Sequence, residues 1–222
     1  MAEGGSPRWW KIDRIEIANY PYLCTDDLCY YYLERSHGTW KESEANRIVS
    51  NFQRSVTKYH DRADVLCYKD NAIRFFAERI ANLIAKKKRA CPLVIVPMVT
   101  SKPKSHCWYD DRLVRTAQTV ASLRPGEVAV CDILDVVTET SKAKLGGSRN
   151  PEEIERNLDV GVPDCPEAEV VFLIDDVITT GGHFAACRNA IRPLFPKAKI
   201  VGVFLARQKS GYEYSVVEFP YE

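Results

Sequence analysis

The sequence predicts an α/β fold with a doubly wound, mostly parallel sheet. Its main support is a set of largely apolar segments rich in β-branched residues, which is typical of strands buried on both faces. These segments are residues 93–97, 128–134, 170–174 and 199–206. Between them lie stretches in which apolar residues recur every three or four positions, as in amphipathic helices. Strands that alternate with helices in this order favour a parallel sheet.

The spacing of apolar residues, together with the residues at each end, places the helices. It predicts helices over residues 71–85, 110–123 and 184–194. Residues 45–59 show the same spacing and predict a helix with one apolar face.

The two ends of the chain have weaker patterns. Residues 10–20 alternate imperfectly between apolar and charged side chains, and we expect a strand there. Residues 25–27 (Thr-Asp-Asp) can cap a helix over residues 28–35. Residues 212–219 alternate and predict a terminal strand.

Composition limits the class of protein. The chain has 222 residues, of which 45% are hydrophobic and 27% charged, with a formal net charge of +1. A chain of this length can bury a sizeable core. Its nearly balanced charge disfavours a protein around which nucleic acid wraps, but it is compatible with a local basic patch. The eight cysteines include no Cys-x-x-Cys pair, which favours reduced and mostly buried thiols. No apolar stretch has the length of a membrane span or the form of a signal peptide, so a cytoplasmic protein is expected.

We expect three parts along the chain. They are a disordered leader over residues 1–8, a helical N-terminal cap or hood over residues 9–65, and a core over residues 66–222 that forms one compact unit with the cap. The cap is rich in aromatic side chains, which would either stack on a base above a nucleotide site, or pack internally or in a dimer surface. These side chains are Trp9, Trp10, Tyr20, Tyr22, Tyr30, Tyr31, Tyr32 and Trp40.

Two carboxylates follow the third apolar segment directly. Asp175 and Asp176 come after Ile174 and are followed by the turn of residues 179–182 (Thr-Thr-Gly-Gly) and by a predicted helix. Such a turn presents backbone N–H groups at a helix N-terminus, where the helix dipole favours a phosphate. Carboxylates beside a phosphate suit sugar hydroxyls and a hydrated divalent cation, for which we expect Mg²⁺. The alternative is a plain strand, turn and helix with solvated acids.

This stretch resembles the phosphoribosyl pyrophosphate (PRPP) signature of the type I phosphoribosyltransferases. The resemblance implies that Asp175 and Asp176 are catalytic residues that hold the ribose hydroxyls and Mg²⁺. It also implies a cradle for the 5′-phosphate, made of Thr179, Thr180, Gly181, Gly182 and His183. Where the family usually has Thr or Ser this chain has His183, whose imidazole can donate a hydrogen bond instead.

Two further loops are similar in position to loops of that family. Thr100, Ser101 and Lys102 follow the first apolar segment, and the resemblance implies that they bind the pyrophosphate; an ordinary polar loop is the alternative. The long polar stretch of residues 138–150 matches the place of a flexible lid. From this lid Lys142 would either act as a catalytic residue at the leaving pyrophosphate or stay solvated.

The lid also resembles the corresponding segment of ComF-like phosphoribosyltransferase domains. The similarity rests on Thr138, Ser141, Leu145 and residues 155–157, with Lys142 in place of a glutamine. The resemblance implies a link to DNA processing as an alternative function.

The resemblance as a whole implies transfer of the phosphoribosyl group from PRPP to a nucleobase or similar nitrogen nucleophile, with release of pyrophosphate. The protein would act by positioning and electrostatics, because the sugar passes through an oxocarbenium-like state. A non-catalytic protein that senses PRPP or a nucleotide is a second interpretation. We expect a homodimer and no membrane partner. Nucleic acid is not favoured as a partner, because the basic run at residues 86–89 fits a solvated helix end.

Overall fold

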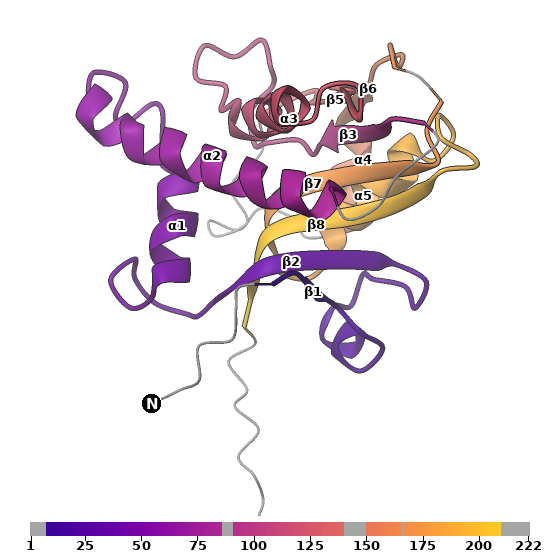
Figure 1. The fold of residues 1–222 in the computed structure, drawn as a ribbon, viewed down its shortest axis with the longest axis horizontal. Helices are drawn as coiled ribbons and strands as arrows, with labels where there is room; N and C mark the ends of the chain where they lie inside the picture. Colours follow the sequence, from indigo (N-terminus) through magenta and orange to yellow (C-terminus); the bar gives the residue numbers. More distant parts are fainter. Residues whose placement is uncertain (1–7, 86–90, 140–149, 166, 210–222) are drawn as a thin grey trace, which may run out of the picture.

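The computed structural model describes residues 8–85, 91–139, 150–165 and 167–209, which form an α/β fold around a mostly parallel sheet (Figure 1). Within these residues the central sheet has the strand order β1, β2, β8, β7, β3, β4, and its only antiparallel pair is β1 with β2. Its strands are β1 (Trp10–Lys11), β2 (Leu28–Arg35), β3 (Leu93–Pro97), β4 (Val128–Val130), β7 (Val170–Ile178) and β8 (Lys199–Gln208). A separate antiparallel pair consists of β5 (Leu134–Val136) and β6 (Leu158–Val160).

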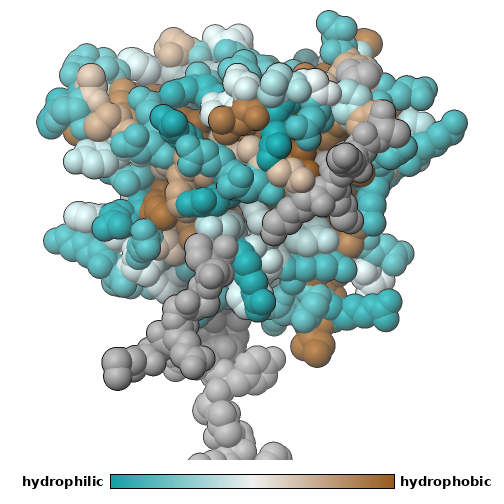
Figure 2. All heavy atoms as spheres, viewed as in Figure 1, coloured by the Kyte–Doolittle hydropathy of each residue, from teal (hydrophilic) through white to brown (hydrophobic). Residues whose placement is uncertain are grey.

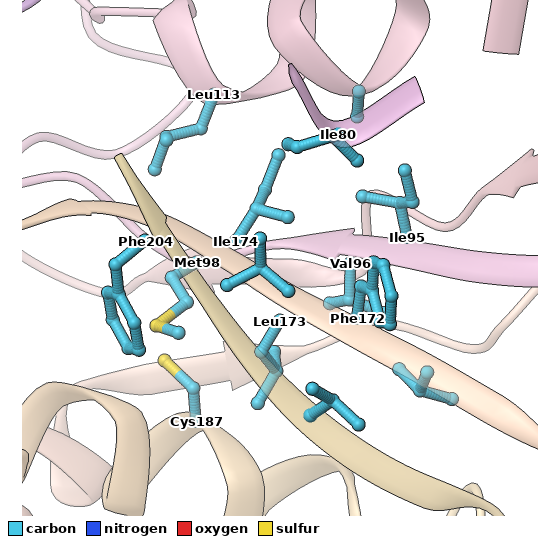
Figure 3. Packing of buried hydrophobic residues seen from close by; sticks show 14 of the residues in the cluster. Ile80, Ile95, Val96, Met98, Leu113, Phe172, Leu173, Ile174, Cys187 and Phe204 are labelled. Carbon is cyan, nitrogen blue, oxygen red and sulfur yellow. The ribbon is translucent and has the colours of Figure 1, made fainter. Parts of the chain in front are cut away.

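Helices cover both faces of the central sheet. They are α1 (Glu44–Phe52), α2 (Ala63–Ile84), α3 (Arg112–Leu123), α4 (Pro151–Arg156) and α5 (Gly182–Ile191), with a short 3-10 helix η1 (Glu16–Asn19). In Figure 3, Leu113 of α3 and Ile80 of α2 lie on the side of the sheet to which Ile174 points, and Cys187 of α5 lies on the side of Leu173. Since neighbours along a strand point to opposite faces, α2 and α3 cover one face and α5 covers the other.

Strand β7 lies between β3 and β8, and its first half is almost fully buried. Val171, Leu173 and Ile174 have 0% exposed surface. Ile174 pairs with Pro97 of β3 on one side and with Val203 of β8 on the other. Because both faces are covered, the strand is apolar at successive positions rather than at alternate ones. Because β3 and β7 are parallel, the chain segments that follow them leave the sheet at the same end, where the carboxyl ends of both strands lie.

Strand β8 passes so close to α5 and β2 that one of its positions has room only for glycine. A Cβ atom on Gly202 would lie 2.9 Å from the Sγ atom of Cys29 and 3.0 Å from the ring of Phe184. Both neighbours are buried in the core, where side chains have little room to move. Gly202 therefore allows α5 to lie directly on the sheet.

Most of the predicted core elements are confirmed. The bounds of β3 are as predicted, and β7 and β8 extend the predicted strands to Ile178 and Gln208. Helices α3 and α5 correspond to the helices predicted over residues 110–123 and 184–194. Helix α2 is confirmed as well, but it begins at Ala63, well before the predicted start.

The helix predicted over residues 28–35 is wrong, because these residues form β2. Asp27, expected to cap that helix, closes a turn instead: its Oδ2 atom accepts a hydrogen bond from the backbone N–H of Cys24 at 2.8 Å. Strand β2 is rich in tyrosine and pairs with β8, which lies far along the chain. Aromatic residues favour a strand where a partner strand is available, and this partner is invisible to local patterns.

The strand predicted over residues 10–20 is mostly wrong. Only β1 is extended, and η1 follows it. The carboxylate of Asp13 causes the change, because its Oδ1 atom accepts hydrogen bonds from the backbone N–H groups of Ile15 and Glu16, each at 2.8 Å. Such local bonds from Asp compete with strand pairing.

Two other predicted elements are shorter than expected. The helix predicted over residues 45–59 ends at Phe52. The strand predicted over residues 128–134 is divided: β4 ends at Val130, and Leu134 belongs to β5. Between them Asp132 lies 2.7 Å from the Nζ atom of Lys104 through its Oδ1 atom, so the chain leaves the central sheet at a charged residue.

The predicted cap, residues 9–65, supplies β1 and β2 to the central sheet, and its aromatic side chains near the sheet pack internally. The Trp9 ring lies 5.4 Å from that of Tyr32, and its indole N–H donates a hydrogen bond to the carbonyl oxygen of Arg79 at 3.2 Å. Tyr31 is 2% exposed. Packing is therefore the role of these aromatic residues. The leader up to residue 7 and the predicted terminal strand lie outside the described residues.

Polar side chains cover most of the face shown in Figure 2, and hydrophobic ones appear there in small separate groups. Among the helices that the structure describes, none is long and apolar enough to cross a membrane. All eight cysteines are free thiols, although the Sγ atoms of Cys131 and Cys165 lie only 3.1 Å apart.

We predict that Gly202→Ala lowers the free energy of unfolding by about 1–3 kcal/mol, because the added methyl group overpacks the space between β8, Cys29 and Phe184. Urea denaturation at 25 °C measures this loss. Gly161→Ala is the control, since a Cβ atom there would meet its nearest neighbour at an ordinary 3.6 Å. Equal stability of the two variants would contradict the prediction.

Candidate functional site

The two signature carboxylates lie near the carboxyl end of β7 and point to opposite faces of the sheet. The Oδ2 atom of Asp175 lies 2.8 Å from the Nδ1 atom of His183 in α5. The Oδ2 atom of Asp176 accepts hydrogen bonds from Arg112 Nη2 of α3 at 2.8 Å and from Gln53 Nε2 at 2.9 Å. The two carboxylate side chains are only 8% and 11% exposed. Each acid therefore has a basic partner on its own face.

Asp176 is the last member of a chain of ion pairs that crosses the α1, α2 and α3 face. Lys69 Nζ lies 2.8 Å from Asp110 Oδ1, and Asp110 Oδ2 lies 2.9 Å from Arg112 Nη1. Lys69 is 1% exposed and also donates hydrogen bonds to two backbone carbonyl oxygens, those of Phe52 at 3.1 Å and Arg54 at 3.0 Å. Positive and negative groups thus alternate from α2 to the end of β7.

The partners decide the charge of each acid. Burial opposes ionisation of Asp176, but Arg112 and the hydrogen bond from Gln53 outweigh it and hold the pKa of Asp176 below its ordinary value. Burial and the neighbouring charge of Asp176 raise the pKa of Asp175, against the effect of His183. Burial lowers the pKa of His183, but contacts with Cys187 and Asp175 outweigh it, so the pKa of His183 is well above its ordinary value.

The turn after β7 has the backbone geometry expected of an anion-binding turn. Gly181 has a φ of 82°, in the left-handed region, and α5 begins at Gly182. The first turn of a helix presents unpaired N–H groups and the positive end of the helix dipole. A Cβ atom on Gly181 would lie 2.7 Å from the side chain of Leu23, and the N–H of Tyr22 donates to the carbonyl oxygen of Thr180 at 3.3 Å. Residues of the N-terminal third therefore support this turn.

The predicted pyrophosphate residues follow β3 and lie beside the start of the lid. Lys102 Nζ lies 2.6 Å from Glu139 Oε1 and 3.3 Å from His106 Nε2. The Thr100 hydroxyl lies within 3.5 Å of the Lys102 carbonyl oxygen, and Ser101 lies between these two residues. Since β3 and β7 are adjacent parallel strands, this loop and the Gly181 turn leave the same edge of the sheet.

The lid residues 140–149, which include Lys142, lie outside the described residues. The chain segments on the two sides of this predicted lid are held together. The Thr138 hydroxyl donates to Asn157 Oδ1 at 2.8 Å, and Asn157 Nδ2 donates to the Thr138 carbonyl oxygen at 2.9 Å. Asn189 of α5 donates to Glu155 Oε1 at 2.6 Å, so α4, which follows the predicted lid, is tied to α5.

Sequence reasoning missed four polar residues that complete the acid pair: Gln53, Lys69, Asp110 and Arg112. Lys69 lies in a helix among apolar residues, which was a signal of a buried cation that needs a partner. The partner itself could not be predicted, because Lys69 and Asp110 are 41 positions apart in the chain.

Magnesium binding by Asp175 and Asp176 remains a prediction. Their carboxylates point to opposite faces of the sheet and already contact His183 and Arg112, so they do not form a ready-made pair of ligands. Within the described ranges no group of three or more His, Cys, Asp or Glu side chains is arranged around a possible metal ion. This donor set does not fit a resident magnesium ion; Mg²⁺ carried by substrate phosphates needs only one or two protein carboxylates.

Comparisons with known proteins return phosphoribosyltransferases among solved structures. A hypoxanthine phosphoribosyltransferase from Staphylococcus aureus is 13% identical, with a TM-score of 0.32, over 64% of this chain and 68% of that one. Adenine phosphoribosyltransferases from Trypanosoma brucei and Leishmania tarentolae are each 11% identical, with TM-scores of 0.39 and 0.40. They cover 86% and 81% of this chain, and 90% and 91% of their own. No family model and no curated protein sequence matches the chain.

We predict that Lys69→Met lowers the free energy of unfolding by about 3 kcal/mol, because Asp110 loses its buried partner. Urea denaturation measures the change. Combining it with Asp110→Asn should cost less than the sum of the two single variants, as expected for groups in direct contact. Arg115→Gln, which breaks the exposed pair of Arg115 with Asp70, is the control and should cost less than about 1 kcal/mol. A loss no greater than that of the control would contradict a structural role for Lys69.

We predict that His183 stabilises the fold more at pH 6 than at pH 9. Its pKa is raised in the folded state, so the stabilisation is complete below the unfolded pKa of about 6.5 and is lost as pH rises through the folded pKa. The side chain is 35% exposed, so solvent screening should keep the effect below about 1 kcal/mol.

The measurement is the difference in unfolding free energy between the original protein and His183→Gln at each pH. A His183→Gln difference that is constant or grows with pH would contradict the prediction.

Proposed function

We propose that the chain binds PRPP at the carboxyl edge of β3 and β7 and transfers its phosphoribosyl group to a nitrogen nucleophile, with release of pyrophosphate. The observation that carries the proposal is the turn at Gly181. Gly181 has a left-handed backbone at the N-terminus of α5, shortly after the acid pair, and its turn leaves the sheet at the same end as the loop that follows β3. This end of the sheet therefore offers a helix start for a phosphate, carboxylates for sugar hydroxyls, and a second polar loop for a further phosphate group. A sugar that carries phosphate groups at two positions requires these three parts.

Each part of PRPP is assigned to one part of this edge. The 5′-phosphate binds at the start of α5, at residues 179–183, and the ribose hydroxyls donate to free lone pairs of Asp175 and Asp176. The pyrophosphate binds at residues 100–102, where Lys102 exchanges Glu139 for a phosphate oxygen. Mg²⁺ arrives with the pyrophosphate as part of the substrate. Lys142 of the lid remains the candidate for a further contact with the leaving group.

The reaction exchanges one bond at C1 of the ribose for another. The bond from C1 to the pyrophosphate oxygen breaks, and its electron pair leaves with pyrophosphate. The nucleophile forms the C1–N bond with its lone pair and releases its proton to solvent. The protein stabilises the positively charged sugar between these two events by holding carboxylates nearby in a site with little water.

A non-catalytic PRPP sensor is the second candidate function. It is favoured by the acid pair, because both carboxylates already have basic partners within the chain. A link to DNA processing is the third candidate; the basic run at residues 86–89 on which it depends lies outside the described residues. A homodimer and a cytoplasmic location remain predictions.

Two measurements separate the first two functions. Calorimetry with PRPP and Mg²⁺ tests binding, and pyrophosphate release with a panel of nucleobases tests transfer. Binding together with release supports the enzyme, and binding without release from any base supports the sensor. Absence of PRPP binding would overturn both.

We predict that Gly181→Ala raises the dissociation constant for PRPP at least about 10-fold, which corresponds to about 1.4 kcal/mol. The added Cβ atom would lie 2.7 Å from Leu23 in a left-handed conformation that alanine rarely adopts, so the turn must change shape. Gly126→Ala is the matched control, because Gly126 has a φ of 76° but nothing within 4 Å of an added Cβ atom. Calorimetry should show unchanged PRPP binding for the control. The same loss in both variants would point to general destabilisation instead.

A further inference from the structure

A cavity of about 310 Å³ lies at the carboxyl end of β2, between the turn of residues 36–42 and α1. In Figure 1 this turn joins the end of β2 to α1. The side chains that matter for binding come from Arg35, Trp40, Ser50 and Gln53. A space of this size corresponds to the smaller sites that proteins use for compact ligands.

The walls of the cavity are held in place by buried hydrogen bonds. Asn46 is 3% exposed, and its amide accepts from the Ser36 N–H at 3.2 Å and donates to the Thr39 carbonyl oxygen at 3.1 Å. Ser43 caps α1 by accepting a hydrogen bond from the Asn46 N–H at 3.0 Å. The turn is therefore formed before any ligand binds, which lowers the entropic cost of binding.

The charge of the cavity favours an anion. The Arg35 guanidinium has no hydrogen-bond or ion-pair partner within the part of the chain that the structure describes. The nearby Glu42 carboxylate accepts a hydrogen bond from the Thr39 N–H at 2.9 Å and is directed at that turn. An unpaired guanidinium presents a planar set of donors that matches a carboxylate through two parallel hydrogen bonds.

The remaining lining groups favour a planar ring with an N–H group. Trp40 is 55% exposed and offers an aromatic surface, near which lies the Lys41 ammonium at 5.6 Å from the ring centroid. Aromatic surfaces favour stacked planar ligands. Gln53 uses its Nε2 donor on the ionised Asp176 at 2.9 Å, which leaves its Oε1 atom as an acceptor for a ring N–H.

Gln53 also connects the cavity with the candidate PRPP site. The same side chain lines the cavity and contacts Asp176, one of the two signature carboxylates. A ring in the cavity would therefore lie on the face of the sheet to which Asp176 points. This is the side from which a nucleophile could approach a ribose held by that carboxylate.

We infer that this cavity holds the acceptor, and that the acceptor is a planar nitrogen heterocycle bearing a carboxylate. Arg35 binds the carboxylate, Trp40 contacts the ring, and Gln53 accepts a hydrogen bond from a ring N–H. The inference rests on the proposed function for its reaction, but the binding site itself can be tested without PRPP.

Orotate and uracil are suitable probes, because they share one ring and differ in a carboxylate. Calorimetry at fixed ionic strength should give a dissociation constant at least 10-fold lower for orotate than for uracil. Arg35→Met should abolish this preference and leave PRPP binding unchanged, and Trp40→Leu should weaken both ligands. Arg47→Met is the matched control, because Arg47 is 58% exposed on α1 and pairs with Glu44; it removes the same charge and should keep the preference.

Equal affinity of the original protein for orotate and uracil would overturn the inference without any variant. A preference that survives Arg35→Met would overturn the role of Arg35, and loss of the preference in Arg47→Met would attribute it to net charge alone. These failures differ from failure of the proposed function. If orotate binds through Arg35 but PRPP does not bind, the ligand site stands and the transferase proposal falls; if PRPP reacts with bases that lack a carboxylate, only the acceptor class is wrong.

Discussion

The site depends on the burial of one carboxylate at the end of the central strand. Asp176 lies near the carboxyl end of β7, and its side chain is 11% exposed. Burying an unpaired ion in such a place costs several kcal/mol of folding free energy. Arg112 offsets that cost, but it is itself mostly buried and lies between two acids, so Asp110 must be paired in turn with Lys69. Compensation of one charge therefore extends from β7 through α3 to α2 before each charged group has a partner of opposite charge.

This chain of charges explains why the elements around β7 are arranged as they are. Lys69 donates hydrogen bonds to the carbonyl oxygens of Phe52, at the end of α1, and of Arg54, and it pairs with Asp110 just before α3, so it joins both helices to α2. Asp175 points the other way and contacts His183 of α5. The two neighbouring acids thus connect the helices on both faces to the strand that carries the Gly181 turn. Contacts with Arg112, Gln53 and His183 hold these carboxylates in place, and fixed charges of this kind are what electrostatic stabilisation of a charged intermediate in the proposed reaction would require.

The parts of this structure that could be predicted from the sequence are those encoded by near neighbours. A run of consecutive apolar residues predicts the strand Leu93–Pro97, and the Thr-Thr-Gly-Gly sequence predicts the turn at Gly181; both predictions are correct. Strand β2 was missed because its partner β8 is distant in the chain, and without that partner residues 28–35 looked like a helix. Arg112 and Gln53 were missed for the same reason. Hydrophobic periodicity reports burial, but it does not report which buried charges meet.

The same distinction separates the two halves of the proposed reaction. The donor side is a local motif, in which carboxylates, glycine and a helix start follow one another within a few residues. The cavity proposed for the acceptor is lined by the end of β2, the turn that follows it, and α1 with Gln53. The side-chain amide of Gln53 connects this cavity with the proposed PRPP site, because it donates a hydrogen bond to Asp176. Because that amide donates to Asp176, a change of charge on Asp176 alters which atom Gln53 can offer to the cavity. In the proposed reaction, recognition of the donor and of the acceptor would therefore be coupled through the hydrogen bond between Gln53 and Asp176.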